Sequence, residues 1–169
     1  PEKSNSYEFG AEQYLFGEKL IASITYFHAI YRNTIDSPYN SVTWFSGQYV
    51  NIGKSQAHGV EASIAIKPID AVKFTGGMTL MVTKDFQNDQ EMPRRPGKKI
   101  FAECFWQATE KLYLDMKVRY EGPRSDNLNT FVNTYKVKEY TVVDMVINYE
   151  ISKNFSVYTK IDNLFNKYY

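Results

Sequence analysis

The alternation of apolar and polar residues is the main feature of this sequence. It is clearest between residues 112 and 121, where Leu112, Leu114, Met116, Val118 and Tyr120 alternate with Tyr113, Asp115, Lys117, Arg119 and Glu121. Successive side chains of a β-strand point to opposite faces of the sheet. This segment therefore predicts a strand with one apolar face and one mostly charged face.

The same period of two recurs along the chain and predicts about eight strands and no helix. The other predicted strands cover residues 6–16, 19–32, 60–67, 72–83, 100–108, 141–150 and 155–163. The pattern is weaker in the first two, because Gln13 falls in the apolar set of one and Ile21 and Phe27 in the polar set of the other. The expected fold class is an all-β antiparallel meander.

The connections between these strands alternate in length. Tight turns are predicted at 17–18, 68–71, 109–111 and 152–154, and longer polar stretches at 33–47, 85–97 and 122–137. Outer-membrane barrels have short periplasmic turns and long external loops, and their strands need about 9–11 residues to cross the bilayer. The pattern thus favours an antiparallel up-and-down transmembrane β-barrel.

Composition is compatible with membrane strands. The mean hydropathy of −0.45 is polar, but strands that alternate between lipid and lumen average out in this way. The longest uncharged apolar run, residues 20–31, is shorter than the roughly 18 residues of a membrane helix. With 20 basic and 19 acidic residues, the chain lacks the positive field that binds nucleic acid.

The sequence contains no recognisable catalytic motif, so we expect no enzymatic activity, cofactor or metal site. The two histidines, His28 and His58, fall on different predicted strands, and the single cysteine is Cys104. Acidic residues crowd one predicted loop but lack the spacing and glycine of an EF-hand. They are Asp85, Asp89 and Glu91.

Several stretches resemble the TonB-dependent receptors of the Gram-negative outer membrane. Residues 1–10, PEKSNSYEFG, resemble the family's PEKS-x-x-Y-E-x-G segment, and residues 51–61 resemble its N-x-G-K-A-x-x-x-G-V-E motif, with Ser55 as the departure. Residues 163–169, NLFNKYY, resemble N-L-F-D-K-x-Y, with Asn166 in place of the acid. Residues 92–96, MPRRP, resemble a P-x-R-P return from an external loop.

The resemblance implies a barrel of about 22 strands around an N-terminal plug. Residues 1–169 are then expected to be a single segment, the C-terminal portion of the barrel, beginning in an external loop. The plug, the TonB box, the signal peptide and a closing strand after Tyr169 are expected to lie outside it. Such a segment has two unpaired edges, so we expect it not to fold as an isolated monomer.

The function implied by the resemblance is active transport across the outer membrane. External loops would capture a scarce ligand, most often a ferric siderophore and otherwise haem, cobalamin or a glycan. TonB, acting through the plug, would supply energy from the inner membrane. Outer-membrane lipid is the other expected partner.

Ligand contacts are expected on the long loops, where aromatic and guanidinium groups can stack and pair with a ligand. The candidates are Tyr39, Trp44, Phe45, Arg94, Arg95, Arg124, Asn127, Asn129, Phe131 and Tyr135. Charged residues of the strands should face the lumen or the plug: Glu61, Asp115, Lys117, Arg119, Asp144, Lys160 and Asp162. Ordinary rim and lumen positions carry the same residue types.

Two alternatives remain open at this point. A complete small outer-membrane barrel of eight strands, with a structural or adhesive role, could close by pairing the strands that contain Ser6 and Phe155. A soluble up-and-down barrel would turn the apolar faces inward around a hydrophobic ligand.

Overall fold

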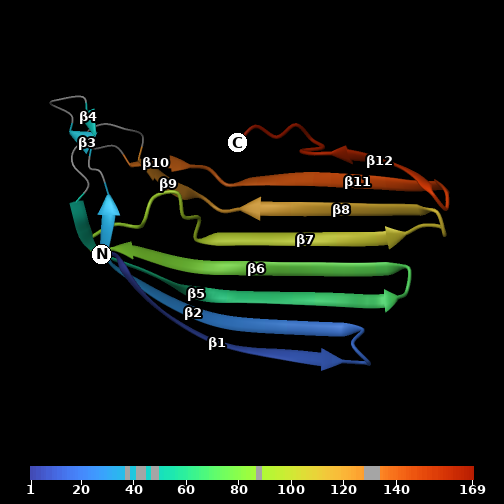
Figure 1. Ribbon diagram of the computed structural model, residues 1–169, viewed down its shortest axis with the longest axis horizontal. Coiled ribbons are helices and arrows are strands. Elements are labelled where there is room, and N and C mark those ends of the chain that lie inside the picture. The colour runs from blue at the N-terminus through green and yellow to red at the C-terminus, as the bar shows by residue number, and fades with distance from the viewer. Residues whose placement is uncertain (37–38, 41–44, 47–49, 87–88, 128–133) are drawn as a thin grey trace.

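The computed structural model describes residues 1–36, 39–40, 45–46, 50–86, 89–127 and 134–169. Eight long strands form one antiparallel sheet (Figure 1). They are β1 (Lys3–Leu15), β2 (Leu20–Asp36), β5 (Val50–Ile69), β6 (Val72–Asp85), β7 (Lys98–Gln107), β8 (Leu112–Glu121), β11 (Tyr140–Ser152) and β12 (Phe155–Ile161). The order across the sheet is β1-β2-β5-β6-β7-β8-β11-β12, so the predicted meander of eight strands is confirmed.

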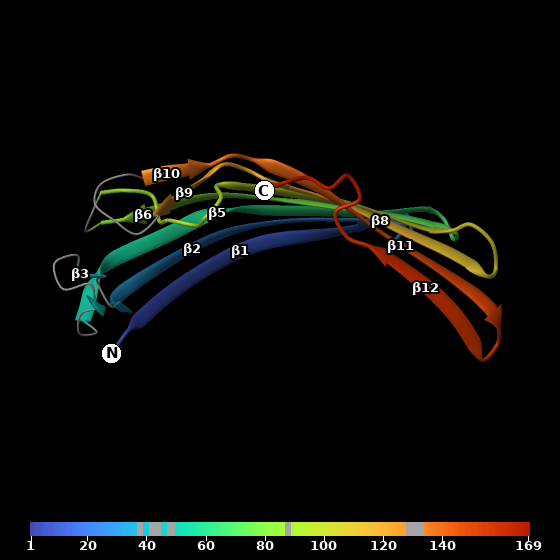
Figure 2. The ribbon, with the colours of Figure 1, turned by 90° about the horizontal axis from the view of Figure 1, so that it is seen from above.

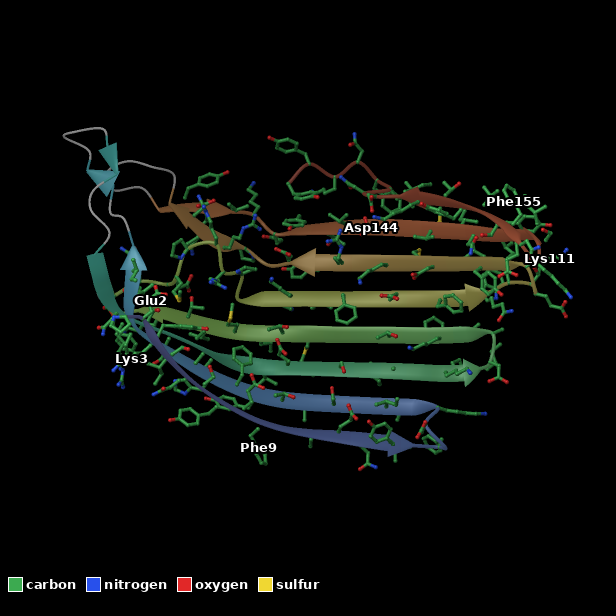
Figure 3. The ribbon with its side chains drawn as sticks, viewed as in Figure 1. Glu2, Lys3, Phe9, Lys111, Asp144 and Phe155 are labelled. Atoms are coloured by element: carbon green, nitrogen blue, oxygen red, sulfur yellow. The ribbon has the colours of Figure 1, made fainter. Side chains whose placement is uncertain are left out.

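The two ends of the sheet differ. Tight turns join the strands at one end, and at the other lie two small hairpins, β3 (Tyr39–Asn40) with β4 (Phe45–Ser46) and β9 (Arg124–Asn127) with β10 (Thr134–Val137). Figure 3 shows Lys3 at the hairpin end and Lys111 and Phe155 at the tight-turn end. We call these the loop end and the turn end.

At the loop end, the strands are longer than the sequence predicts. Strand β2 continues to Asp36 and β5 begins at Val50, and the two pair as far as these residues. The prediction of a loop over residues 33–47 was therefore wrong at its start, and the strand predicted over 60–67 was too short. Backbone pairing continues where neither face is apolar, and there the alternation no longer marks it.

The register assigns each residue to one of two faces, because directly opposed residues of neighbouring strands point to the same side. Glu61 opposes Thr25 and Thr79, and Thr79 opposes Lys99. We call this side the polar face. The other side, the apolar face, carries opposed residues such as Tyr26, Val60, Leu80, Ile100, Val118 and Val143.

The apolar face is uncovered. The one buried aliphatic side chain among the described residues, Val142, belongs to the polar face, whereas on the apolar face Phe9 is 82% and Val82 is 59% exposed. Soluble monomers seldom expose apolar patches of more than a few hundred Å². A face of this kind needs an apolar environment outside the chain.

The sheet is bowed but open (Figure 2). In the described part of the chain, β1 pairs with β2 alone and β12 with β11 alone. The closing pair that the small complete barrel requires is not formed among these residues. This arrangement agrees with a segment of a wider barrel.

Two glycines accommodate aromatic side chains on the polar face. Phe27 opposes Gly59, and a Cβ on Gly59 would lie 2.9 Å from Phe27 Cζ and 2.1 Å from the Leu80 carbonyl oxygen. Phe101 opposes Gly77 in the same way, 2.6 Å from a Cβ placed there. Aromatic residues packed over cross-strand glycines stabilise sheets, which explains why Phe27 interrupts the polar set of its strand.

The described residues form no helix that could cross a membrane.

Candidate functional site

A groove of about 530 Å³ lies on the polar face across β2, β5, β6, β7 and β8. Glu61, Lys117 and Arg119 line it together with Lys99 and Glu121. Thr79 Oγ1 donates to Glu61 Oε1 at 3.4 Å, and the Ser23 and Ser63 hydroxyls lie 2.7 Å apart. The structure thus brings three of the predicted lumen residues together in one groove, which Met78 and Phe101 also line.

A second hollow on the polar face gathers the charges of β8, β11 and β12. Arg119 donates to Asp144 Oδ2 from Nη2 at 2.8 Å and from Nε at 3.2 Å. Asp144 Oδ1 accepts the backbone N–H of Asn163 at 2.9 Å. Asp144 therefore connects β8 and β11 to the segment that follows β12.

The other charges of this hollow are also mostly paired. Lys160 Nζ lies 3.0 Å from Asp162 Oδ1, and Lys117 Nζ lies 3.3 Å from Glu103 Oε2. Asp115 lines the same hollow, but its Oδ1 is buried without a hydrogen bond. Arg119 and Asp144, Lys160 and Asp162, and Lys117 and Glu103 thus form three ion pairs, whereas Asp115 Oδ1 has no hydrogen bond.

At the loop end, Arg94 fixes the connection between β6 and β7 to the β9–β10 hairpin. Its Nε donates to Asp126 Oδ1 at 2.8 Å, and its backbone N–H donates to the Ser125 carbonyl at 2.7 Å. Arg94 adopts a positive φ of 60°. In the same connection, Thr83 Oγ1 accepts the backbone N–H of Met92 at 3.0 Å. The Nε of Arg94 is thus hydrogen-bonded within the protein, and the rest of its side chain is largely exposed.

A neighbouring hollow of about 190 Å³ collects cations from three elements. Arg95, Arg124 and Lys136 line it, together with Glu91. Arg124 Nη1 lies 3.6 Å from Glu121 Oε2, and the Arg124 guanidinium lies 5.7 Å from the centre of the Tyr140 ring. This site offers positive charge, guanidinium donors and an aromatic ring, which suits an anionic aromatic ligand.

The remaining predicted ligand residues are only partly placed. Tyr135 is 55% exposed in β10, where it opposes Asp126. Tyr39, Phe45 and Asn127 are residues of strands β3, β4 and β9, respectively. Trp44, Asn129 and Phe131 lie outside the described residues.

Three further residues of this region, Asp126, Lys136 and Tyr140, were not predicted as ligand residues from the sequence. The hairpin register explains their positions, because Lys136 opposes Ser125 and Tyr135 opposes Asp126. The alternation in residues 124–127 and 134–137 is too short to have predicted this pairing. The Tyr140 ring also stacks on Tyr169, with 4.4 Å between the ring centroids.

The two histidines lie on different strands, as predicted, and these strands, β2 and β5, are neighbours in the sheet. His28 opposes His58, and the ring centroids lie 5.8 Å apart. Cys104 lies on β7, and no cluster of three or more metal-ligating side chains occurs among the described residues.

Comparison with known proteins defines the class. Residues 1–164 match the sequence profile of the family described as "TonB dependent receptor-like, beta-barrel". The chain belongs to this family, and its strands are part of an outer-membrane β-barrel. In such barrels the polar face of the wall lines the lumen and the apolar face contacts lipid, and on this basis we assign the two faces as lumen face and lipid face. Short turns lie at the periplasmic end of such barrels and long loops at the external end, and we assign the turn end and the loop end accordingly.

The similar proteins include several siderophore receptors. The ferric enterobactin receptor of Pseudomonas aeruginosa is 27% identical over 88% of this chain and 22% of its own length. The ferrienterobactin receptor of Escherichia coli is 24% identical, with coverage of 87% and 21%. This chain spans about a fifth of the length of these relatives.

Solved structures agree with this assignment. A structure of a variant of the Pseudomonas aeruginosa ferric enterobactin receptor superposes with a TM-score of 0.81 at 25% identity. The match covers 98% of this chain and 26% of that one. The copper transporter OprC, at 18% identity and a TM-score of 0.80, shares the fold.

Proposed function

We propose that this chain is the C-terminal portion of the barrel of an active importer, and that its external end helps to capture a ferric catecholate siderophore. The observation that carries the proposal is the cationic hollow formed by Arg95, Arg124 and Lys136 beside Tyr140. The relatives named as receptors for ferric enterobactin and for catecholate siderophores support the ligand class.

The chemistry of the hollow matches such a ligand. A catecholate carries two negative charges, so a ferric ion surrounded by three of them forms an anionic complex with flat aromatic edges. Arginine binds planar anions through a fork of N–H donors, and charge-assisted hydrogen bonds are about twice as strong as neutral ones. Arg95 is exposed and free to turn toward a ligand, whereas Arg124 is held between Glu121 and Tyr140.

Transport requires energy, which the outer membrane cannot take from nucleotides. In the proposed mechanism TonB acts on a plug inside the complete barrel, and the polar face lines the passage. Glu61, Asp115, Lys117, Arg119 and Asp144 are the proposed contacts to the plug or to water. The lumen charges are largely paired with each other, so the wall can keep its structure while the plug moves.

Binding and uptake of radiolabelled ferric enterobactin by cells that depend on the complete receptor test this proposal. The variant Arg95→Gln with Arg124→Gln should bind the complex about 10- to 100-fold more weakly, because two charged donors are lost. The matched control, Lys73→Gln with Lys111→Gln, removes the same charge at the turn end and should leave binding unchanged.

The outcomes separate the parts of the proposal. Uptake that continues in a strain without TonB would overturn the import mechanism. Wild-type binding by the double arginine variant would overturn the site and leave the mechanism intact. No binding of ferric enterobactin by the wild-type receptor would overturn the ligand class.

A further inference from the structure

A row of cations crosses the apolar face at the external end of the sheet. Lys3 opposes Arg32, and Arg32 opposes Lys54, so the three lie side by side on β1, β2 and β5. Lys84 of β6 continues the row, since it opposes Gln56 next to Lys54 on the same face. All four side chains are exposed. We call these four residues the outer cationic row.

The row consists largely of unpaired charges. Among the described residues, no carboxylate forms an ion pair with Lys3, Arg32 or Lys54. The lumen side differs, because Lys117, Arg119 and Lys160 each pair with a carboxylate there. Adjacent cations repel one another unless anions lie nearby. An anionic partner from outside the chain would therefore reduce the repulsion within the row.

Lys84 sits at the border of the row. Its Nζ lies 2.7 Å from Asp89 Oδ1, and both its Nζ and that of Lys54 lie over the Phe86 ring, at 5.5 and 4.6 Å from its centroid. Phe86 is 42% exposed. An exposed aromatic ring among cations is an amphipathic arrangement typical of a membrane interface.

The height of the row on the barrel indicates its partner. Lys3, Arg32 and Lys84 lie equal numbers of residues from Leu15, Leu20 and Val72, the strand ends at the periplasmic turns. At about 3.3 Å per residue and a tilt of about 40°, this length corresponds to roughly 30 Å along the barrel axis. The apolar band of outer-membrane barrels is about 25 Å tall. The row thus lies just above the hydrocarbon, at the level of the lipid head groups.

We propose that the outer cationic row binds the phosphorylated head groups of lipids in the external leaflet. The apolar residues below it, among them Tyr7, Ile30 and Val60, would contact the acyl chains of the same lipid. Ammonium and guanidinium groups bind phosphate through charge-assisted hydrogen bonds. This proposal depends on the orientation of the barrel in the membrane, and it is independent of the imported ligand.

The test is a titration of the purified complete receptor in zwitterionic detergent with lipid A that carries both phosphates, followed by native mass spectrometry. The variant with Lys3→Gln, Arg32→Gln and Lys54→Gln should bind one lipid A about 100-fold more weakly, at roughly one factor of five per lost charge. A control with Lys73→Gln, Lys111→Gln and Lys153→Gln has the same change in net charge at the periplasmic end and should bind like wild type. Variant Lys3→Arg with Lys54→Arg keeps the charge and should also bind like wild type.

Two further probes distinguish the source of the phosphate. Dephosphorylated lipid A should bind the wild-type receptor as weakly as lipid A binds the triple variant, and inorganic phosphate should not displace lipid A at equal concentration. Unchanged lipid A binding by the triple variant would overturn the proposal. So would equal binding of dephosphorylated lipid A, or displacement by inorganic phosphate alone.

Discussion

The two faces of this sheet are both exposed in the isolated chain, yet they are built differently. On the lumen face, glycines, threonines and ion pairs such as Arg119–Asp144 form a surface held by its own contacts. On the lipid face, aliphatic and aromatic side chains fill the middle, and cations occur at the external border. Water is the solvent of one face and lipid that of the other, and the comparison shows that each face is matched to its solvent.

A charge placed in the middle of the lipid face should break this match most strongly. Met78→Arg should destabilise the complete barrel by about 2–4 kcal/mol, because the guanidinium lies near the bilayer midplane. The neighbouring substitution Thr79→Arg points into the lumen beside Glu61 and should change stability by less than about 1 kcal/mol. Unfolding of the barrel by guanidinium chloride in lipid vesicles measures the stability of both variants. Equal losses of stability would contradict the assignment of the faces.

The next largest loss of stability is expected from a substitution that disturbs close packing on the lumen face. Gly59→Ala should cost about 1–3 kcal/mol, because its Cβ would lie 2.1 Å from the Leu80 carbonyl oxygen and the strands must shift. The control Gly76→Ala places a Cβ 3.6 Å from its nearest neighbour, the Phe101 carbonyl oxygen, an ordinary contact. Unfolding midpoints in lipid vesicles compare the two. A Gly59→Ala barrel as stable as Gly76→Ala would show that the close approach is unimportant.

Ion pairs of the lumen face should contribute different amounts to stability, according to how exposed they are. Asp144, whose side chain is 15% exposed, loses two hydrogen bonds in Arg119→Ala, which should cost about 1–3 kcal/mol. Lys160→Ala breaks the exposed pair with Asp162 and should cost at most about 1 kcal/mol. The same unfolding assay provides the comparison. A larger loss from Lys160→Ala would reverse the order that burial predicts.

The smallest effect is expected at a periplasmic turn. Lys67 donates a hydrogen bond to Asp70 and attracts it electrostatically, and both effects lower the pKa of the Asp70 carboxyl. A lowered folded-state pKa stabilises the fold above the ordinary carboxyl pKa of about 3.9, and this stabilisation is lost as the pH falls through the folded value. Asp70→Asn should therefore be slightly less stable than wild type at neutral pH and equal to it at strongly acid pH. A difference that grows as the pH falls would have the wrong sign.

Most of the sheet could be predicted from the sequence because lipid and lumen impose a period of two. Strand β8, predicted over residues 112–121, has those bounds in the structure. The prediction failed beyond about Arg32 on β2 and before Lys54 on β5, because outside the bilayer both faces meet water. Between Lys54 and Val60 the alternation is broken by Gln56 and His58 on the apolar face.

The candidate site was less predictable, because it depends on contacts between loops. Arg95 and Arg124 could be proposed from residue type, but their approach to Lys136 follows from the β9–β10 hairpin, which is too short to leave a pattern. The pairing of His28 with His58 likewise depends on the register of β2 with β5. Register across two strands is set by their turn and by packing, and it cannot be read from either strand alone.

The central claim is that this chain is a section of barrel wall with lipid on one face and water on the other. A spin-label scan of residues 112–121 in the complete receptor, with Cys104→Ser as background and lipid vesicles as host, tests it most directly. The account predicts that labels at even positions collide with oxygen in the lipid and labels at odd positions with a water-soluble nickel complex. Accessibility without this period of two, or with the two sets exchanged, would contradict it.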